Sequence, residues 1–238
     1  MGTVLLISFH CKHSHAEVVL SYYGGAALTD DNDLKLHQPG GTSLTFHDVS
    51  WSDQSFESPY YYGARLTYWL VSKPRWGAAV DFTHAKIYLD LSDTVHVMGK
   101  RDGVSVNDRE RVGDTFERFN LSHGHNFFTV NLMYRWFPKG KRDESLLGRL
   151  QPYVGVGAGA AYPHVETTID GVKTDEYQLA GPAVKGMVGL NYDLWKHLST
   201  FVEYKLIYAD LDLDLKGGGS VQTETVTHNL AFGISVGF

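Results

Sequence analysis

The chain has 238 residues and a net charge of −6, with neither a basic arm nor a basic helix, so the sequence does not favour a nucleic-acid partner. Glycine is abundant, at 25 residues, and 13% of the residues are aromatic, which is typical of an all-β protein. No run of 18 apolar residues occurs. This excludes a transmembrane helix but not a membrane-spanning barrel, whose strands carry apolar side chains only at alternate positions.

The N-terminal segment, residues 1–16, has the features of a signal peptide. An apolar stretch from Val4 to Phe9 precedes Ser14-His15-Ala16, which fits a small-x-small cleavage site. The basic segment that normally opens a signal peptide is missing and the apolar core is short. We therefore interpret residues 1–16 as a truncated signal peptide cleaved after Ala16, and residues 17–238 as the mature barrel domain. Cys11, the only cysteine, would be lost with it, which fits export.

Period-2 alternation of apolar and polar or small residues predicts eight strands. They cover residues 17–27, 60–71, 76–89, 123–137, 150–166, 176–192, 199–210 and 222–238. In the last strand, apolar residues alternate from Leu230 to the terminal Phe238, which is how outer-membrane barrels characteristically end. Each segment is long enough to cross a bilayer when tilted.

The connections between these strands alternate in length. Those at 72–75, 138–149 and 193–198 are mostly short, those at 28–59 and 90–122 are long, and those at 167–175 and 211–221 are intermediate. Short turns on one rim and long loops on the other are typical of outer-membrane barrels. We therefore predict an all-β fold: a closed, eight-stranded antiparallel up-and-down transmembrane β-barrel with long extracellular loops. The predicted location is the bacterial outer membrane, as a monomer.

Several charged residues fall on the inward-facing parity of the predicted strands. An eight-stranded barrel has room inside only for side chains, and unpaired charge there is costly. We therefore expect a buried structural network of ion pairs and no water-filled pore. Its members are Arg65, Asp81, Arg135, Lys185, Glu203 and Lys205.

The outward-facing stripes change character at the long-loop rim. His84 and Lys86 continue the apolar stripe that runs from Trp76 to Phe82, and His164 and His228 hold similar positions on other strands. His84 lies eight residues beyond Trp76, roughly 19 Å higher at 3.3 Å per residue and 45° tilt, near the top of the apolar band. Such residues either anchor the barrel at the interface or contact the lipid A head group.

Two further motifs have simpler explanations. Gly155, Gly157 and Gly159 share the inward parity and leave space for long side chains rather than forming a phosphate loop. Asp212 and Asp214 lie on one face of a strand tip, as a solvated loop or as a site for a cation that bridges lipopolysaccharide phosphates.

The sequence "LSHGHN" (121–126) places Ser122 beside His123, as in a Ser–His hydrolase pair. Neighbours on a regular strand point to opposite faces, so this pairing requires a bulge. By parity with Phe128, His123 and His125 are expected to face inward.

Five stretches together resemble the lipid A oxidase family of alphaproteobacterial outer-membrane barrels. They are "VDFTHAKIY" (80–88), "HGHNFFTVNLMYRW" (123–136), "PYVGVGAGAAYPHVE" (152–166), "YQLAGPAV" (177–184) and "FVEYKLIYAD" (201–210). The similarity covers nearly the whole mature chain, from "LSYYGG" (20–25) to the terminal Phe. It implies oxidation of the proximal glucosamine of lipid A to a 2-aminogluconate unit, with O2 as co-substrate.

The resemblance assigns no catalytic residues, so the expected roles rest on position. Oxidation at the anomeric carbon requires removal of a proton, for which His84 and His164 are the candidates as base or metal ligand, with Glu166 nearby. Lys86 and His228 are the candidates for binding the lipid A head group, Lys86 as a point charge on a phosphate.

Cofactors are less well defined than the candidate residues. No flavin or nicotinamide motif is visible. A metal would accelerate the slow reaction of a sugar with oxygen, but the sequence identifies no ion. The alternatives are a lipid A deacylase and a non-enzymatic structural or adhesive barrel.

Overall fold

The computed structural model describes residues 17–136 and 147–238. The expected signal peptide, with Cys11, and most of the turn at 138–149 lie outside the described residues. The strands are β1 (Glu17–Thr29), β2 (Asn32–Gln38), β3 (Thr42–Val49), β4 (Trp51–Asp53), β5 (Tyr62–Trp69), β6 (Trp76–Leu89), β7 (Thr94–Arg101), β8 (Val104–Arg111), β9 (Arg118–Arg135), β10 (Leu150–Ala161), β11 (His164–Ile169), β12 (Val172–Tyr177), β13 (Gly181–Asp193), β14 (Leu198–Asp214) and β15 (Ser220–Gly237). Two 3-10 turns, η1 (Val112–Asp114) and η2 (Leu147–Arg149), complete the elements. No helix in the described residues is long and apolar enough to cross a membrane.

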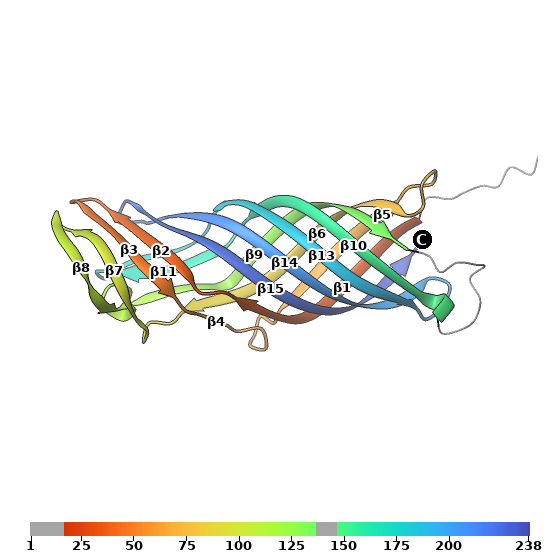
Figure 1. Cartoon of the computed structure of the whole chain (residues 1–238), viewed down its shortest axis with the longest axis horizontal. Coiled ribbons are helices and arrows are strands. Elements are labelled where there is room, and N and C mark those ends of the chain that lie inside the picture. Colours follow the sequence, from red (N-terminus) through yellow and green to blue (C-terminus); the bar gives the residue numbers. More distant parts are fainter. Residues whose placement is uncertain (1–16, 137–146) are drawn as a thin grey trace, which may run out of the picture.

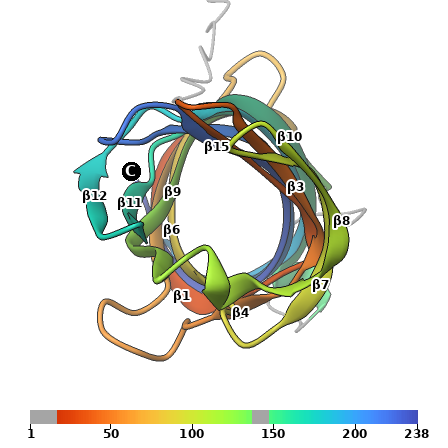
Figure 2. The same ribbon diagram turned by 90° about the vertical axis from the view of Figure 1, so that its left-hand side faces the viewer.

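Eight strands pair as antiparallel neighbours in the order β1-β5-β6-β9-β10-β13-β14-β15, and β15 pairs back to β1. Figure 2 shows this ring end-on, and Figure 1 shows its strands running obliquely along the long axis of the molecule. The prediction of an all-β, antiparallel architecture is confirmed. The register keeps the expected faces, since Arg65 pairs with Asp81 and Ala64 with Phe82 across β5 and β6.

The outer face of the ring carries a belt of exposed apolar side chains. On β9, Phe128, Val130 and Leu132 are 50%, 64% and 53% exposed, and every other ring strand contributes similar residues. Water would not favour a continuous apolar surface of this kind, whereas lipid does. Trp76 and Trp136 lie where the belt meets the end that carries Glu17 and Phe238, as in the aromatic girdle of a barrel in a membrane. The ring is therefore a membrane-spanning barrel of the outer-membrane type, and by the rule for such barrels that end faces the periplasm.

The interior behind this belt is polar and ionic. Arg65 contacts Glu203 Oε2 at 2.5 Å and Asp81 Oδ2 at 3.7 Å, and Lys185 contacts Asp81 Oδ1 at 3.0 Å. Lys205 lies 3.6 Å from Glu203 Oε1. All five side chains are at most 5% exposed. Mutual pairing is what permits charge at this depth, because an isolated ion there would lose its hydration without replacement.

Arg135 occupies a different place from the other expected members of the network. It lies at the periplasmic end of the lumen, where Nη2 contacts Glu17 Oε2 at 2.5 Å and the guanidinium lies 4.0 Å from the centre of the Trp69 ring. Tyrosines link the inner network instead. Tyr23 donates to Asp81 Oδ1 at 2.8 Å, and Tyr153 donates to Glu203 Oε2 at 2.7 Å.

Beyond the apolar belt the barrel continues, but there the apolar side chains face its interior and the polar side chains face outward. The segments expected as loops at 28–59 and 90–122 contain β2, β3, β4, β7, β8 and the start of β9. On β14 the buried residues are Leu211 and Leu213, while Asp212 and Asp214 are exposed. These side chains belong to a large apolar core that also includes Phe46 and Phe116. Solvent outside this part of the barrel explains why its apolar residues face inward.

The predicted strand at 150–166 is divided in the structure. β10 ends at Ala161, and β11 begins at His164 after Tyr162-Pro163. Proline has no N–H to donate to a ladder, which favours a break here. Below the break β10 pairs with β9 and β13. Above it β11 pairs with β9 and folds back as a hairpin with β12, which lies outside the ring in Figure 2.

Candidate functional site

A bulge in β9 determines which side chains gather at the outer rim. His125 pairs with Ala85 of β6 and Leu121 pairs with Ile87, so residues 122–124 lie opposite the single residue Lys86. Gly124 has φ +137°, in a region that side chains rarely adopt, which allows the strand to bend. Ser122 and His123 consequently lie on the same outer side of β9, with His123 exposed and Ser122 buried.

The β11–β12 hairpin places two more polar side chains against this bulge. Along β11, Val165 and Ile169 are buried in the apolar core, so His164 and Glu166 point to the outer side. Glu166 pairs with Asn120 of β9, one strand position from the bulge. The side chains of Glu166 and His164 are only 5% and 13% exposed, so the hairpin delivers a nearly buried carboxylate to the outer wall of the barrel.

Glu166 is the centre of the resulting cluster. Its Oε1 accepts hydrogen bonds from Ser122 Oγ and contacts His123 Nδ1 at 2.6 Å, while Oε2 accepts from the guanidinium of Arg118. Burial raises the pKa of this carboxyl, but the hydrogen bonds from Ser122 and His123 and the charge of Arg118 outweigh it and leave the pKa below its ordinary value. Glu166 is therefore a carboxylate at neutral pH.

His164 lies between two carboxylates. Its Nδ1 is 3.6 Å from Glu166 Oε1, and its Nε2 is 3.3 Å from Asp175 Oδ1 on β12. A hydrogen bond from Lys173, together with the charges of Lys173, His164 and His123, lowers the pKa of Asp175. The imidazole rings of His123 and His164 lie 5.0 Å apart, and one donor atom from each of His123, His164 and Glu166 falls within 4.8 Å of the others. Among the described residues, this is the one group of three such side chains close enough to hold a metal ion.

The cluster lies just above the apolar belt. Phe82 and Phe128, whose rings are 4.8 Å apart, mark the upper part of the belt on β6 and β9. Lys86, opposite the bulge, is four residues beyond Phe82, about 9 Å higher at 3.3 Å per residue and 45° tilt. Tyr162 and Tyr177 are exposed beside the cluster with their rings stacked at 5.7 Å, at a level suited to amphipathic aromatic side chains.

Of the three expected catalytic residues, two lie in the cluster and one does not. His164 and Glu166 come together as described, whereas His84 lies outside this group. His84 has the expected outward parity but is only 3% exposed, with its ring stacked on Tyr62 at 4.7 Å. Its Nδ1 contacts Asn126 Oδ1 at 2.8 Å, and Asn126 donates to the carbonyl of Tyr162. Its Nε2 is buried without a hydrogen-bond partner.

Neither of the two expected head-group ligands is a member of the cluster. Lys86 is only 2% exposed, and its ammonium donates to the carbonyl of Glu57 at 2.8 Å. His228 lies on β15, separated from β6 in the ring by β1 and β5, where it contacts Tyr204 Oη at 2.6 Å and Asp30 Oδ2 at 3.2 Å.

The expectation that His123 faces inward is wrong, because its side chain is 62% exposed. Parity counted back from Phe128 holds as far as His125, which is buried inside the barrel, and then fails at the bulge. The signal for this was Gly124, since an isolated glycine within a strand pattern indicates a bulge.

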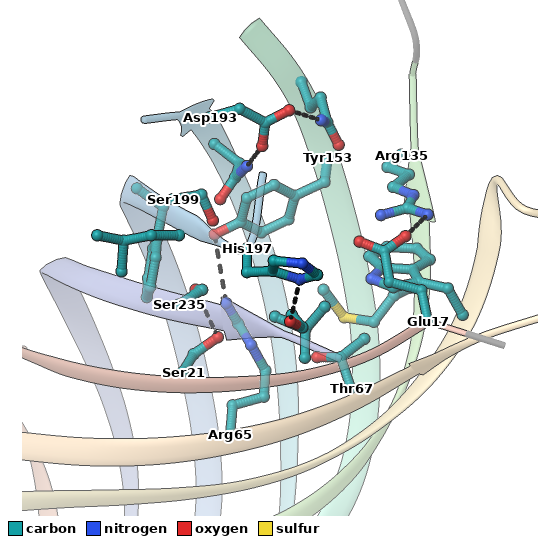
Figure 3. A pocket seen from close by; sticks show the side chains of 18 of the residues that line it. Glu17, Ser21, Arg65, Thr67, Arg135, Tyr153, Asp193, His197, Ser199 and Ser235 are labelled. Atoms are coloured by element: carbon teal, nitrogen blue, oxygen red, sulfur yellow. Dashed lines mark hydrogen bonds and ion pairs between the residues drawn. The ribbon is translucent and has the colours of Figure 1, made fainter. Parts of the chain in front are cut away.

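A separate pocket opens at the periplasmic mouth of the barrel (Figure 3). Most of its polar lining side chains are paired with each other: Arg135 with Glu17, Gln151 with Asp193, and Ser21 with Ser235. It lies at the opposite end of the strands from the rim cluster, and its paired groups indicate a structural role in closing the lumen.

Comparison with known proteins shows general likeness only. No family model and no curated protein sequence matches this chain. Among solved structures, Neisserial surface protein A is 13% identical, with a TM-score of 0.44 over 93% of this chain and 98% of that one. The outer membrane protein OprG from Pseudomonas aeruginosa is 14% identical, with a TM-score of 0.38 over 94% and 95%. Ail, the attachment invasion locus protein of Yersinia pestis, is 13% identical, with a TM-score of 0.37 over 92% and 98%. At these values no property of those proteins transfers to this chain.

Proposed function

We propose that this chain is an outer-membrane enzyme that acts on the head group of lipid A, by O2-dependent oxidation of the proximal glucosamine to 2-aminogluconate. The observation that carries the proposal is the cluster of His123, His164 and Glu166 on the outer wall of the barrel, about 9 Å above the aromatic pair of the belt. Lipid sugars and phosphates occupy this depth. At this depth the cluster presents a nearly buried carboxylate between two imidazoles.

The chemistry requires a lipid A whose anomeric carbon bears a free hydroxyl. In the oxidation, this carbon loses its hydrogen and the hydroxyl loses its proton, giving a lactone. The two electrons and two protons reduce O2 to hydrogen peroxide. Addition of water then opens the lactone to the aminogluconate, for a net gain of one oxygen atom.

The side chains of the cluster match these needs in kind. A proton acceptor is required at the sugar hydroxyl, and imidazole or carboxylate groups are the usual ones. Glu166 is ionised, and two histidines flank it. Arg118, 47% exposed while bound to Glu166, is a cation beside the cluster with the geometry to bind a phosphate. Lys86 and His228 remain proposed head-group contacts that would need to leave their present partners.

Lipid A deacylation is the second candidate, because Ser122, His123 and Glu166 are in mutual contact. In a hydrolytic triad, one imidazole nitrogen contacts the serine and the other contacts the acid. Here Nδ1 of His123 contacts both Ser122 and Glu166, and Ser122 donates directly to the carboxylate. The serine hydroxyl is therefore not aligned for transfer of its proton to Nε2, which favours oxidation over acyl transfer.

The test is expression in a bacterial host that makes unmodified lipid A with a free anomeric hydroxyl, followed by mass spectrometry of the lipid A under air and without oxygen. Oxidation adds one oxygen atom only under air. Loss of an acyl chain, with or without oxygen, would identify the deacylase. An unchanged lipid A in cells that contain the folded barrel would leave the structural or adhesive role.

Three variants make this test specific to the site. Glu166→Gln and His164→Ala are expected to abolish the added oxygen, whereas His96→Ala is expected to retain it. His96 is a matched control because it is an exposed histidine on the extracellular side, where it contacts Asn107 and the ring of His47 and no member of the cluster in the described part of the chain. Modification that persists in both site variants would reject this cluster as the active site.

A further inference from the structure

We propose that His123, His164 and Glu166 bind one divalent transition-metal ion. Two imidazoles and one carboxylate form the donor set of mononuclear non-haem iron sites, which keep coordination positions open for O2. The site itself follows from the geometry below. The choice of iron over zinc rests on the proposed function.

His164 turns its Nδ1 toward Glu166. Its Nε2 lies 3.3 Å from Asp175 Oδ1, so a proton on Nε2 is stabilised by that carboxylate. With that proton on Nε2, Nδ1 is the nitrogen whose lone pair can bind a metal ion. It is buried, makes no hydrogen bond, and faces Glu166 Oε1 across 3.6 Å. Two acceptors facing each other repel unless a cation lies between them.

The Glu166 carboxylate is held in an orientation suited to a metal ligand. Arg118 holds Oε2, which leaves Oε1 directed at both histidines. An arginine on the outer oxygen is the kind of supporting contact that fixes a ligating carboxylate, and Asp175 supports His164 in the same way. The separation of 3.6 Å between His164 Nδ1 and Glu166 Oε1 is also close to that of two ligands of one ion, since bonds of about 2.1 Å separate the donors by about 3.0 Å at octahedral angles and about 3.4 Å at tetrahedral angles.

His123 must move slightly to bind the ion. Its Nδ1 is already 2.6 Å from Glu166 Oε1, so binding requires the ion to displace the shared proton. The ring is 62% exposed and projects from the bulge, so it has room to move. The same exposure leaves the remaining coordination positions open toward the lipid head groups.

The experiment uses the full barrel refolded in detergent from inclusion bodies, which removes lipopolysaccharide and the cations bound to it. After chelation, the protein is dialysed anaerobically against Fe(II), and in parallel against Co(II) as a visible-absorption probe. The expected result is one ion per folded chain and Co(II) bands typical of nitrogen and oxygen ligands. Folding of every sample is verified by its heat-modifiable gel mobility.

The variants establish which residues bind the ion. His164→Ala, His123→Ala and Glu166→Gln are expected to abolish stoichiometric binding, Asp175→Asn to weaken it about 10- to 100-fold, and His96→Ala to leave it unchanged. No bound ion in the folded wild-type barrel, or equal binding by wild type and Glu166→Gln, would overturn the proposal. Metal binding without lipid A oxidation would leave the site intact and reject the proposed function. Oxidation of lipid A by a metal-free barrel would support the proposed function and reject the metal site.

Discussion

At the scale of single residues, Asp81 shows how a charge is accommodated inside the membrane-spanning part of the barrel. Its two oxygens face Lys185, Arg65 and the hydroxyl of Tyr23. The five-residue network of Arg65, Asp81, Lys185, Glu203 and Lys205 already has three cations and two carboxylates. Asp81→Ala leaves three buried cations with one carboxylate, so we expect a loss of about 3–5 kcal/mol in the free energy of unfolding.

Denaturant titration of the refolded barrel measures this loss. The double variant Asp81→Ala/Lys185→Met is the control, since it removes one charge of each sign and should recover part of the stability. Normal stability combined with lost lipid A modification would show that Asp81 has a role beyond the lumen network.

His84 is expected to act through its neighbours. It contacts Asn126, which in turn holds the carbonyl of Tyr162 immediately before β11. His84→Ala should therefore shift the hairpin that carries His164 and Glu166, and we predict a fall in the rate of lipid A modification of about tenfold to 100-fold. Metal stoichiometry should be retained. Rates of modification measured beside those of His164→Ala check this, because equal and complete loss in both would make His84 a catalytic residue.

At the scale of elements, the bulge in β9 determines whether the site exists. Gly124 has φ +137°, and a Cβ there would lie 2.3–2.5 Å from the side chain of Asn126. We predict that Gly124→Ala displaces His123, abolishes metal binding and lowers stability by about 1–3 kcal/mol, while the ring still forms. Metal analysis and heat-modifiable mobility measure the two effects separately.

Gly103→Ala is the matched control for Gly124→Ala. Gly103 also has a positive φ, +80°, but a Cβ there meets nothing within 4 Å, and it lies in the β7–β8 turn. It should share the backbone strain without the loss of metal. If both variants bind one ion, the bulge does not depend on Gly124.

Sequence reasoning succeeded where one rule held along an entire strand. The alternation from Leu230 to Phe238 or from Trp76 to Phe82 reflects a wall between lipid and a packed lumen, so it predicted the ring strands directly. Above the membrane the outside is water. Leu211 and Leu213 continue the alternation with a period of two residues, but here the apolar side chains face inward. The segments that form strands above the membrane, such as those within 28–59 and 90–122, were expected as loops.

The site was only half predictable for a related reason. His164 and Glu166 were both expected on the outward parity of one strand, and they lie close together although the break at Pro163 moves them onto a hairpin. His123 was missed because residues 122–124 interrupt the parity of β9. A single sequence does not show which distant segment will contact a local break in periodicity. The contact between the bulge and β11 arises only when the two strands pair.

At the scale of the whole molecule, the position of the bilayer determines what the rim cluster touches. β14 provides an internal measure because its outward residues change from apolar, at Val202, to acidic, at Asp212, without a change of face. We predict that Leu206→Arg, in the middle of the outward apolar stretch from Val202 to Tyr208, lowers the free energy of unfolding in lipid vesicles by about 2–4 kcal/mol, as expected for a cation near the bilayer midplane.

Asp212→Arg is the matched control, on the same strand and the same face but above the belt, and it should cost less than about 1 kcal/mol. Comparing the unfolding of each variant in vesicles and in detergent separates the cost of placing a charge in lipid from the cost of disturbed local packing. Only the cost of placing a charge in lipid depends on bilayer thickness. Equal costs at both positions would place the belt elsewhere on the strands and would move the His123–His164–Glu166 cluster away from the lipid head groups. The proposed function therefore depends on the position of the bilayer along the strands, which these two variants measure.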